Sequence, residues 1–160
     1  MAAFIQMPLV YPYKVHLSPE MYNGSVVVED LSVAGNLDGA KMRTTSNSSS
    51  FDYWWFDLVS TTDGAAVNVV FYNAGDVGLD KPLSVEISGT FPNGTTFWNH
   101  VIETKGATIS NGPRGIDAQW KNLGAGFRGT SLEQPTVEYE VKLDSPQLGV
   151  VGDIVLKSVR

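Results

Sequence analysis

The densest chemistry in the sequence lies in residues 51–57, which read Phe-Asp-Tyr-Trp-Trp-Phe-Asp and hold five aromatic rings and two carboxylates. Aromatic walls that bury an apolar ligand, with one carboxylate to make a directed polar contact, are the usual make-up of a small-molecule site. Core aromatic residues and carboxylates bonded to the backbone would give the same sequence. The stretch therefore predicts either a ligand pocket or a packed core, and the residues alone leave both open.

If this stretch is a strand, successive side chains point to opposite faces. Tyr53 and Trp55 then share one face, and Asp52 and Trp54 share the other. Asp52 or Asp57 is the candidate polar group, because Ser or Thr would pack in either place at a lower desolvation cost. The further aromatic side chains that we expect to complete the walls of such a pocket are Phe71, Tyr72, Trp98, Trp120 and Phe127.

Other site chemistries find little support in the sequence. The chain has no cysteine, and its two histidines, His16 and His100, are far apart and lack a zinc-ligand spacing. No nucleophile elbow accompanies them, so a Ser-His-Asp triad is not expected. His100 alternates with Trp98. This spacing fits either a histidine at the rim of a pocket or a structural histidine whose ring nitrogens are hydrogen-bonded within the protein. We expect neither a metal site nor a cofactor.

Length and charge narrow the class of protein. The 160 residues fit a single domain, spanning 1–160, that can bury its own core. The net charge of −6 and the eleven scattered Lys and Arg argue against nucleic acid as a partner. Residues 1–12 are too short to span a bilayer and lack the basic start of a signal peptide. Three glycosylation sequons, at Asn23, Asn47 and Asn93, leave the localisation open between cytoplasmic and secreted.

Alternation of apolar and polar residues is frequent, and helical periodicity is nearly absent. In residues 83–88 the apolar side chains share one face and Ser84, Glu86 and Ser88 the other, which predicts a strand with one face in water. The Asn93-Gly94 pair predicts a hairpin with a type I′ turn. The further predicted strands are 25–31, 51–60, 64–73, 95–103, 107–110, 126–130, 137–143 and 148–159.

About eight or nine short strands with turns between them predict an all-β antiparallel fold. We favour a barrel, with a β-sandwich as the alternative. Strand 64–73 is apolar on both faces, with Asn68 among the residues of one face. A strand of this kind either packs against something outside the sheet or faces a lined cavity.

Residues 52–57 with the following Val59-Ser60 resemble the acid-x-Trp-[Trp/Tyr]-Phe-Asp signature of the carotenoid-hydratase-like lipocalin superfamily. Within it the chain is most similar to fungal Diels–Alderases of polyketide, decalin and tropolone-terpenoid pathways. The resemblance implies a lipocalin-like β-barrel that forms the N-terminal half of a two-domain protein. It also implies a second lipocalin-like domain or chain as partner, with the substrate pocket in the first barrel and at the seam.

The resemblance implies a cofactor-independent pericyclase that folds an apolar polyene, polyketide or terpenoid substrate for a stereoselective Diels–Alder or hetero-Diels–Alder cycloaddition. Such catalysis acts through a near-attack pose and hydrogen bonds to a polarised carbonyl. By this resemblance Asp52, Tyr53 and Asn68 orient or polarise the substrate, and Trp54 and Trp55 join the other aromatic residues as its walls. Two alternatives stay open: a non-catalytic carrier of an apolar metabolite, and an alkene hydratase in which Asp52 donates the proton.

Overall fold

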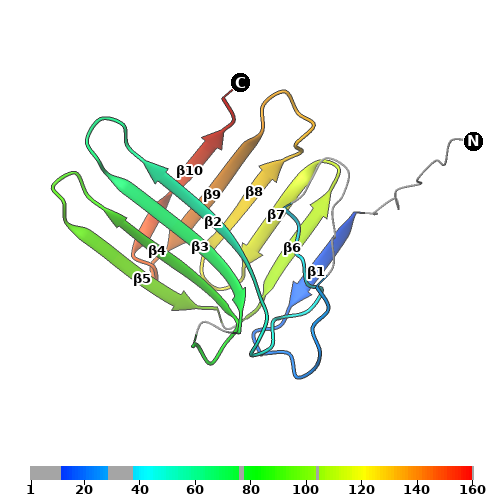
Figure 1. The fold of residues 1–160 in the computed structure, drawn as a ribbon. Coiled ribbons are helices and arrows are strands. Elements are labelled where there is room, and N and C mark those ends of the chain that lie inside the picture. The colour runs from blue at the N-terminus through cyan, green and yellow to red at the C-terminus, as the bar shows by residue number, and fades with distance from the viewer. Residues whose placement is uncertain (1–11, 29–37, 76–77, 104, 160) are drawn as a thin grey trace, which may run out of the picture.

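The structure, a computed structural model, describes residues 12–28, 38–75, 78–103 and 105–159, and ten β-strands lie in them (Figure 1). Every strand pairing is antiparallel. The strands are β1 (Tyr13–Leu17), β2 (Phe51–Val59), β3 (Ala66–Ala74), β4 (Leu83–Thr90), β5 (Thr96–Ile102), β6 (Ala107–Gly112), β7 (Gly115–Trp120), β8 (Ala125–Thr130), β9 (Glu138–Ser145) and β10 (Val150–Lys157).

The strands form two sheets that pack face to face and cross each other (Figure 1). One sheet has the order β1-β6-β7-β8-β9-β10, and the other has the order β2-β3-β4-β5. The all-β antiparallel prediction is confirmed. Pairing among the described strands does not close into one continuous barrel, and the two-sheet arrangement fits both the lipocalin-like fold that we favoured and the β-sandwich alternative.

The two-residue alternation of β2 sets which side chains enter the space between the sheets. Trp54 and Phe56 are buried there, whereas Tyr53 and Trp55 on the other face are exposed. In the register of β2 with β3, Trp54 lies opposite the fully buried Phe71. The strand parity predicted from the sequence is therefore confirmed.

The connection between β4 and β5 is a hairpin, as predicted, but its turn is of another type. Gly94 has a positive φ of 82°, while Asn93 is not among the described residues with positive φ. The Phe91 N–H bonds to the Thr95 carbonyl at 2.8 Å, and the Gly94 N–H bonds to the Phe91 carbonyl at 2.9 Å. This pattern is a three-residue loop with one left-handed position, so the type I′ prediction, which needs two, is wrong.

Three elements differ from those predicted. Strands β1 and β7 were not expected, although Ile116, Ala118 and Trp120 of β7 alternate with polar residues. The alternation in β7 was hidden by its glycine-rich flanks. In the predicted strand 25–31, the described part contains only an isolated bridge from Val28 to Met42. Residues 29–31 of that strand, and residues 1–11 of the amino-terminal segment, lie outside the described part of the chain.

The described loop ahead of β2, residues 38–46, closes one end of the space between the sheets, and we call it the closing segment. The indole N–H of Trp54 donates to the Asp38 carbonyl at 2.8 Å, and the Tyr13 hydroxyl donates to the Ala40 carbonyl at 3.1 Å. The amide oxygen of Asn73 accepts from the Ser46 N–H at 2.8 Å. Because Tyr13 belongs to the six-stranded sheet and the other two to the four-stranded sheet, the segment ties the sheets together.

Replacing Phe71 with Ala should destabilise the protein, because this side chain is fully buried and its ring lies 4.9 Å from that of Trp120 and 5.2 Å from that of Phe127. We expect a loss of about 3–5 kcal/mol in the free energy of unfolding, measured by urea denaturation. The control Val151→Ala, at a side chain 78% exposed, should change it by no more than about 0.5 kcal/mol. Equal effects of the two changes would contradict the described core.

Candidate functional site

The predicted pocket-wall residues divide into two groups on opposite faces of the four-stranded sheet. The inward group packs into one aromatic cluster between the sheets. Within it the Trp54 ring lies 5.7 Å from Trp120 and 5.7 Å from Phe127, and Phe56 lies 5.0 Å from Phe127. The predicted wall residues in this cluster are Trp54, Phe71, Trp120 and Phe127, all nearly or fully buried. Their packing on one another accounts for them as core residues, and contact with a substrate stays a prediction.

The outward group forms a nearly continuous aromatic surface on the outer face of the four-stranded sheet, which we call the aromatic face. Two of its tryptophan side chains are largely in solvent, Trp55 at 55% and Trp98 at 66% exposed. Single exposed apolar residues are common, but a gathered patch of large rings marks a binding surface. The rings of the aromatic face belong to Phe51, Tyr53, Trp55, Tyr72, Trp98 and His100.

The rings of the aromatic face form a chain of neighbouring pairs, with members on β2, β3 and β5. Tyr53 lies 5.8 Å from Phe51, 6.4 Å from Trp55 and 6.3 Å from Tyr72. His100 then lies 5.6 Å from Tyr72 and 6.0 Å from Trp98. These separations are those of favourable aromatic pairs, so the rings support one another and present a surface on which a flat molecule can stack.

Polar groups occupy the centre of the aromatic face. His100 Nε2 shares a hydrogen bond of 2.8 Å with the Ser84 hydroxyl, and its Nδ1 lies 3.9 Å from a carboxylate oxygen of Glu86. Burial lowers the pKa of His100, and Glu86 offsets part of that shift. Burial and the nearby Glu86 carboxylate raise the pKa of Tyr72. The centre therefore presents a hydroxyl that stays protonated and an imidazole that is neutral at pH 7.

Two of the three predicted catalytic residues, Tyr53 and Asn68, lie on this outer face. Asn68 is opposite Asp57 and Ser88 in the sheet register, and Trp98 follows Ser88 in the same row. The amide oxygen of Asn68 is buried and has no hydrogen-bond partner among the described residues. An unsatisfied buried acceptor costs free energy, so a ligand N–H or O–H that reached it would be bound favourably.

Asp52, the third predicted catalytic residue, points to the inner face instead. Its carboxylate accepts a hydrogen bond of 2.7 Å from the Lys41 N–H, which fixes the closing segment. Burial raises the pKa of Asp52 above its ordinary value of 3.8, and the bond from Lys41 opposes part of the shift. Asp52 therefore does not join Tyr53 and Asn68, and the contact that it makes is a structural one.

A family model described as Diels-Alderase-like matches residues 16–160. The chain belongs to the Diels-Alderase-like family. It is 40% identical over 162 residues to a quinolone epoxide rearrangement protein of Penicillium thymicola, and 35% identical over 157 residues to a protein of the same description from Emericella nidulans. The alignments cover 98% and 94% of this chain but only 43% and 40% of those relatives. No solved structure matches the chain.

The sequence did not indicate Ser84 and Glu86 as site residues. They alternate with apolar residues, which predicted that their face of the strand is exposed to solvent. Ser84 is fully buried and Glu86 half-buried, since the rings of the aromatic face cover them. The signal that could have located them was His100, whose alternation with Trp98 places it on the same face of the neighbouring strand. The predicted wall residues Trp55, Tyr72 and Trp98 do come together on this face.

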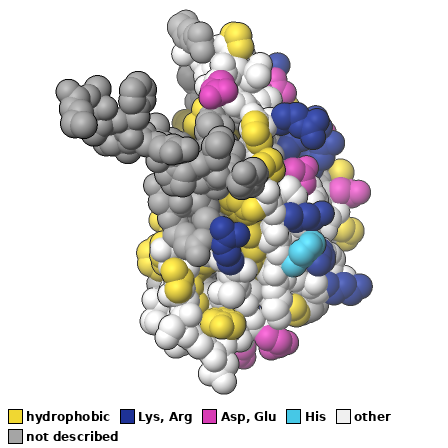
Figure 2. Space-filling view, turned by 90° about the vertical axis from the view of Figure 1, so that its right-hand side faces the viewer, with side chains coloured by type: hydrophobic (Ala, Val, Ile, Leu, Met, Phe, Trp, Pro, Cys, Tyr) yellow, Lys and Arg dark blue, Asp and Glu magenta, His cyan; other side chains and the backbone are white. Residues whose placement is uncertain are grey.

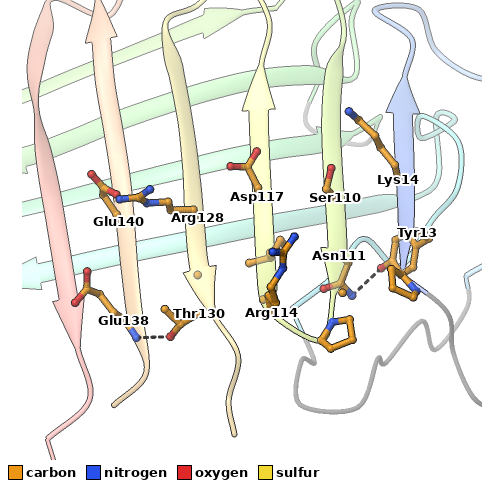
Figure 3. A pocket seen from close by; sticks show the side chains of 16 residues that line it. Tyr13, Lys14, Ser110, Asn111, Arg114, Asp117, Arg128, Thr130, Glu138 and Glu140 are labelled. Atoms are coloured by element: carbon orange, nitrogen blue, oxygen red, sulfur yellow. Dashed lines mark hydrogen bonds and ion pairs between the residues drawn. The ribbon is translucent and has the colours of Figure 1, made fainter. Parts of the chain in front are cut away.

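A hollow of about 890 Å³, separate from the aromatic face, lies on the outer face of the six-stranded sheet (Figure 3). A row of mostly charged side chains crosses the hollow from β1 to β9. In the sheet register its members follow in the order Lys14, Ser110, Asp117, Arg128 and Glu140. Figure 2 shows charged side chains gathered along the margin formed by this sheet. Arg128 and Glu140 form an ion pair across it. The hollow holds none of the predicted site residues, and two of its charged side chains, Arg128 and Glu140, pair with each other.

The described part of the chain shows neither a metal-binding cluster nor a membrane-spanning helix. No three His, Asp or Glu side chains there lie close enough together to hold a metal ion. Among the same residues no helix is long and apolar enough to cross a membrane.

Replacing Asp52 with Asn should stabilise the protein at pH 7, because Asn keeps an oxygen for the Lys41 N–H and carries no charge to desolvate. The pKa of the Asp52 carboxyl is higher in the folded protein than in the unfolded chain. Its contribution to the free energy of unfolding is therefore fully present at pH values below the pKa of the unfolded chain, and it is lost as the pH rises through the pKa of the folded protein. The gain from Asp52→Asn should therefore disappear below pH 3.8. Urea unfolding between pH 3 and 8 measures it, and a gain of equal size at all pH values would contradict this account.

Proposed function

We propose that this chain is one domain of an enzyme that rearranges an epoxide of a flat aromatic lactam, and that it holds this substrate on the aromatic face. The observation that carries the proposal is the exposed surface of touching rings with Tyr72, Glu86 and His100 at its centre. The two relatives are described as acting on a quinolone epoxide. A quinolone is a flat bicyclic lactam, which suits a surface built for stacking.

Binding on this face would combine stacking with one directed polar contact. Trp55 and Trp98 offer exposed ring faces, and each aromatic pair contributes about 0.5–1.5 kcal/mol beyond the area that it buries. The unsatisfied amide oxygen of Asn68 is an acceptor for the lactam N–H. This gives Asn68 the orienting role expected of it from the sequence, and it fixes which edge of the ring system lies over the sheet.

The chemistry is an isomerisation, so atoms and electrons balance without a further reactant. A donor gives a proton to the epoxide oxygen as one C–O bond breaks, a neighbouring group migrates to the electron-poor carbon, and an acceptor takes up the proton released at the end. The Tyr72 hydroxyl is protonated at pH 7 and acts as the donor, and its raised pKa makes it a weaker acid than an ordinary tyrosine. The lowered pKa of His100 keeps its imidazole neutral as an acceptor.

A second candidate is the cycloaddition implied by the resemblance, which the description Diels-Alderase-like favours. A Diels–Alder or hetero-Diels–Alder enzyme would fold a polyene, polyketide or terpenoid on the same aromatic face and would hydrogen-bond its carbonyl from Tyr72. This reaction transfers no proton, so it gives His100 no chemical role. The carrier alternative uses the same face without turnover.

The chain spans less than half the length of the two relatives. We therefore propose, as the resemblance implied, that a second lipocalin-like domain or chain completes the site by covering the aromatic face. Large exposed rings at 55% and 66% exposure are costly to leave in water, which supports a cover of this kind. Closure would also exclude water from a reactive carbocation.

The decisive experiment incubates the protein with a quinolone epoxide and follows the products by liquid chromatography with mass spectrometry. Tyr72→Phe should lower kcat about 100-fold, since a general acid typically contributes at least this much. His100→Gln should lower it by a similar factor. The matched control is Tyr22→Phe, which removes a hydroxyl from a ring that is 43% exposed and outside the aromatic face, and it should change kcat less than about twofold.

Other outcomes separate the alternatives. Equal, small effects of Tyr72→Phe and Tyr22→Phe would contradict the proton-transfer role. A changed product ratio with a polyene substrate, unaffected by His100→Gln, would favour the cycloaddition. Loss of activity in Asp52→Asn alone would favour a carboxylic acid on the inner face, as in the hydratase alternative. Unchanged substrate in every reaction would favour the carrier.

A further inference from the structure

We propose that the open end of the space between the sheets is a second binding site, which takes an uncharged apolar small molecule such as a hydrocarbon chain. The site lies on the inner face of the four-stranded sheet, at the tips of the β2–β3 and β4–β5 hairpins, which lie next to each other in Figure 1. Three residues of its lining, Val59, Ala66 and Thr90, have the outward parity, but no ring of the aromatic face belongs to it, so it goes beyond the function proposed above.

The inner face of this sheet is covered unevenly along its strands. The row of Trp54, Phe71 and Val85 is buried, as is the next row towards the hairpin tips. The last row, formed by Leu58, Val67, Gly89 and Phe97, has the same apolar character but is only partly covered. The inward-facing apolar residues of the four-stranded sheet therefore continue towards the hairpin tips, beyond the part of the sheet that the six-stranded sheet covers.

A hollow of about 480 Å³ lies over this last row. Its lining includes Leu58, Val67, Phe91 and Phe97, and it contains no charged residue. The polar side chains in the lining are the hydroxyls of Ser60 and Thr90. A volume of this size is within the range of small-molecule sites, and a charged ligand would lose its hydration there without gaining an ion pair.

The walls of the hollow are preformed by two closed hairpins. The Ser60 N–H bonds to the Ala65 carbonyl at 2.7 Å, which fixes the β2–β3 tip. The Phe91 and Phe97 rings lie 5.1 Å apart. A Cβ on Gly89 would come within 2.6 Å of the Phe97 ring, so glycine is what allows this ring to lie flat against the sheet. The Phe97 ring forms part of the lining because of this close approach.

The occupant that fits is a small molecule rather than a second copy of the chain. A net charge of −6 makes the chain repel itself, and no cation in the lining would offset that repulsion. The lining has nine residues, whereas a stable interface between proteins uses about 20–30 residues on each side. A single hydrocarbon chain fills the hollow without requiring a polar partner.

The test uses N-phenyl-1-naphthylamine, an uncharged apolar dye whose fluorescence rises in apolar surroundings, titrated into the purified protein. We expect saturable binding with one site per chain. Phe91→Ser should raise the dissociation constant about tenfold, since it removes a ring from the wall. Phe91 is 51% exposed, so this variant should keep its fold, as checked by circular dichroism. The matched control is Val151→Ser on β10, at a residue 78% exposed and outside the lining, which should bind like the original protein.

Trp98→Ser tells the two faces apart, because this side chain belongs to the aromatic face and is absent from the lining. Binding that survives Trp98→Ser and weakens in Phe91→Ser supports the proposal. Binding that is lost in Trp98→Ser and kept in Phe91→Ser would overturn it, as would a signal that never saturates. One dye per two chains with a dimer in sedimentation would also overturn it, since a second copy would then be the occupant.

Discussion

The two-residue alternation of β2 is the constraint on which the rest of the structure depends. Every second side chain of this strand enters the space between the sheets, and the others face outward. Trp54 and Phe56 thereby join the cluster that holds the two sheets together. Trp55, between them, is left on the surface beside Tyr53. One short aromatic run therefore supplies both the core and the surface that we propose binds substrate.

This division resolves the ambiguity of the aromatic run, which as a sequence fitted either a pocket or a packed core. The packed-core interpretation applies to the inner face of the sheet, and we propose the ligand-binding interpretation for its outer face. The polar groups follow the same division. Asp52 points inward and fixes the closing segment through Lys41, while Tyr72, Glu86 and His100 point outward and meet at the centre of the aromatic face. The proton-transfer site that we propose is thus separated from the aromatic core by the sheet itself.

Strand parity was predictable because it depends only on sequence spacing, and so the side chains of β2 were divided correctly between two faces. Which of the two faces is inward was left open. Most strand pairing was not predictable, since it depends on contacts far apart in the sequence. The β4–β5 hairpin was predicted, but a two-residue turn at Asn93-Gly94 would shift its register by one residue, so the sequence did not show that Glu86 lies opposite His100. Nor did it show that Ser84 is buried. The turn at Asn93 also escaped prediction, because a three-residue loop and a type I′ turn share the Asn-Gly signal. The family was predictable because its signature is local and lies within residues 52–57.

The most direct test of the account follows the four tryptophan indole N–H resonances by nuclear magnetic resonance while a quinolone ligand is added. Two of these residues, Trp55 and Trp98, lie on the aromatic face, and the other two, Trp54 and Trp120, lie between the sheets. We predict that the resonances of Trp55 and Trp98 shift with saturation while those of Trp54 and Trp120 stay unchanged. Shifts confined to Trp54 and Trp120 would place the ligand between the sheets and contradict the central claim.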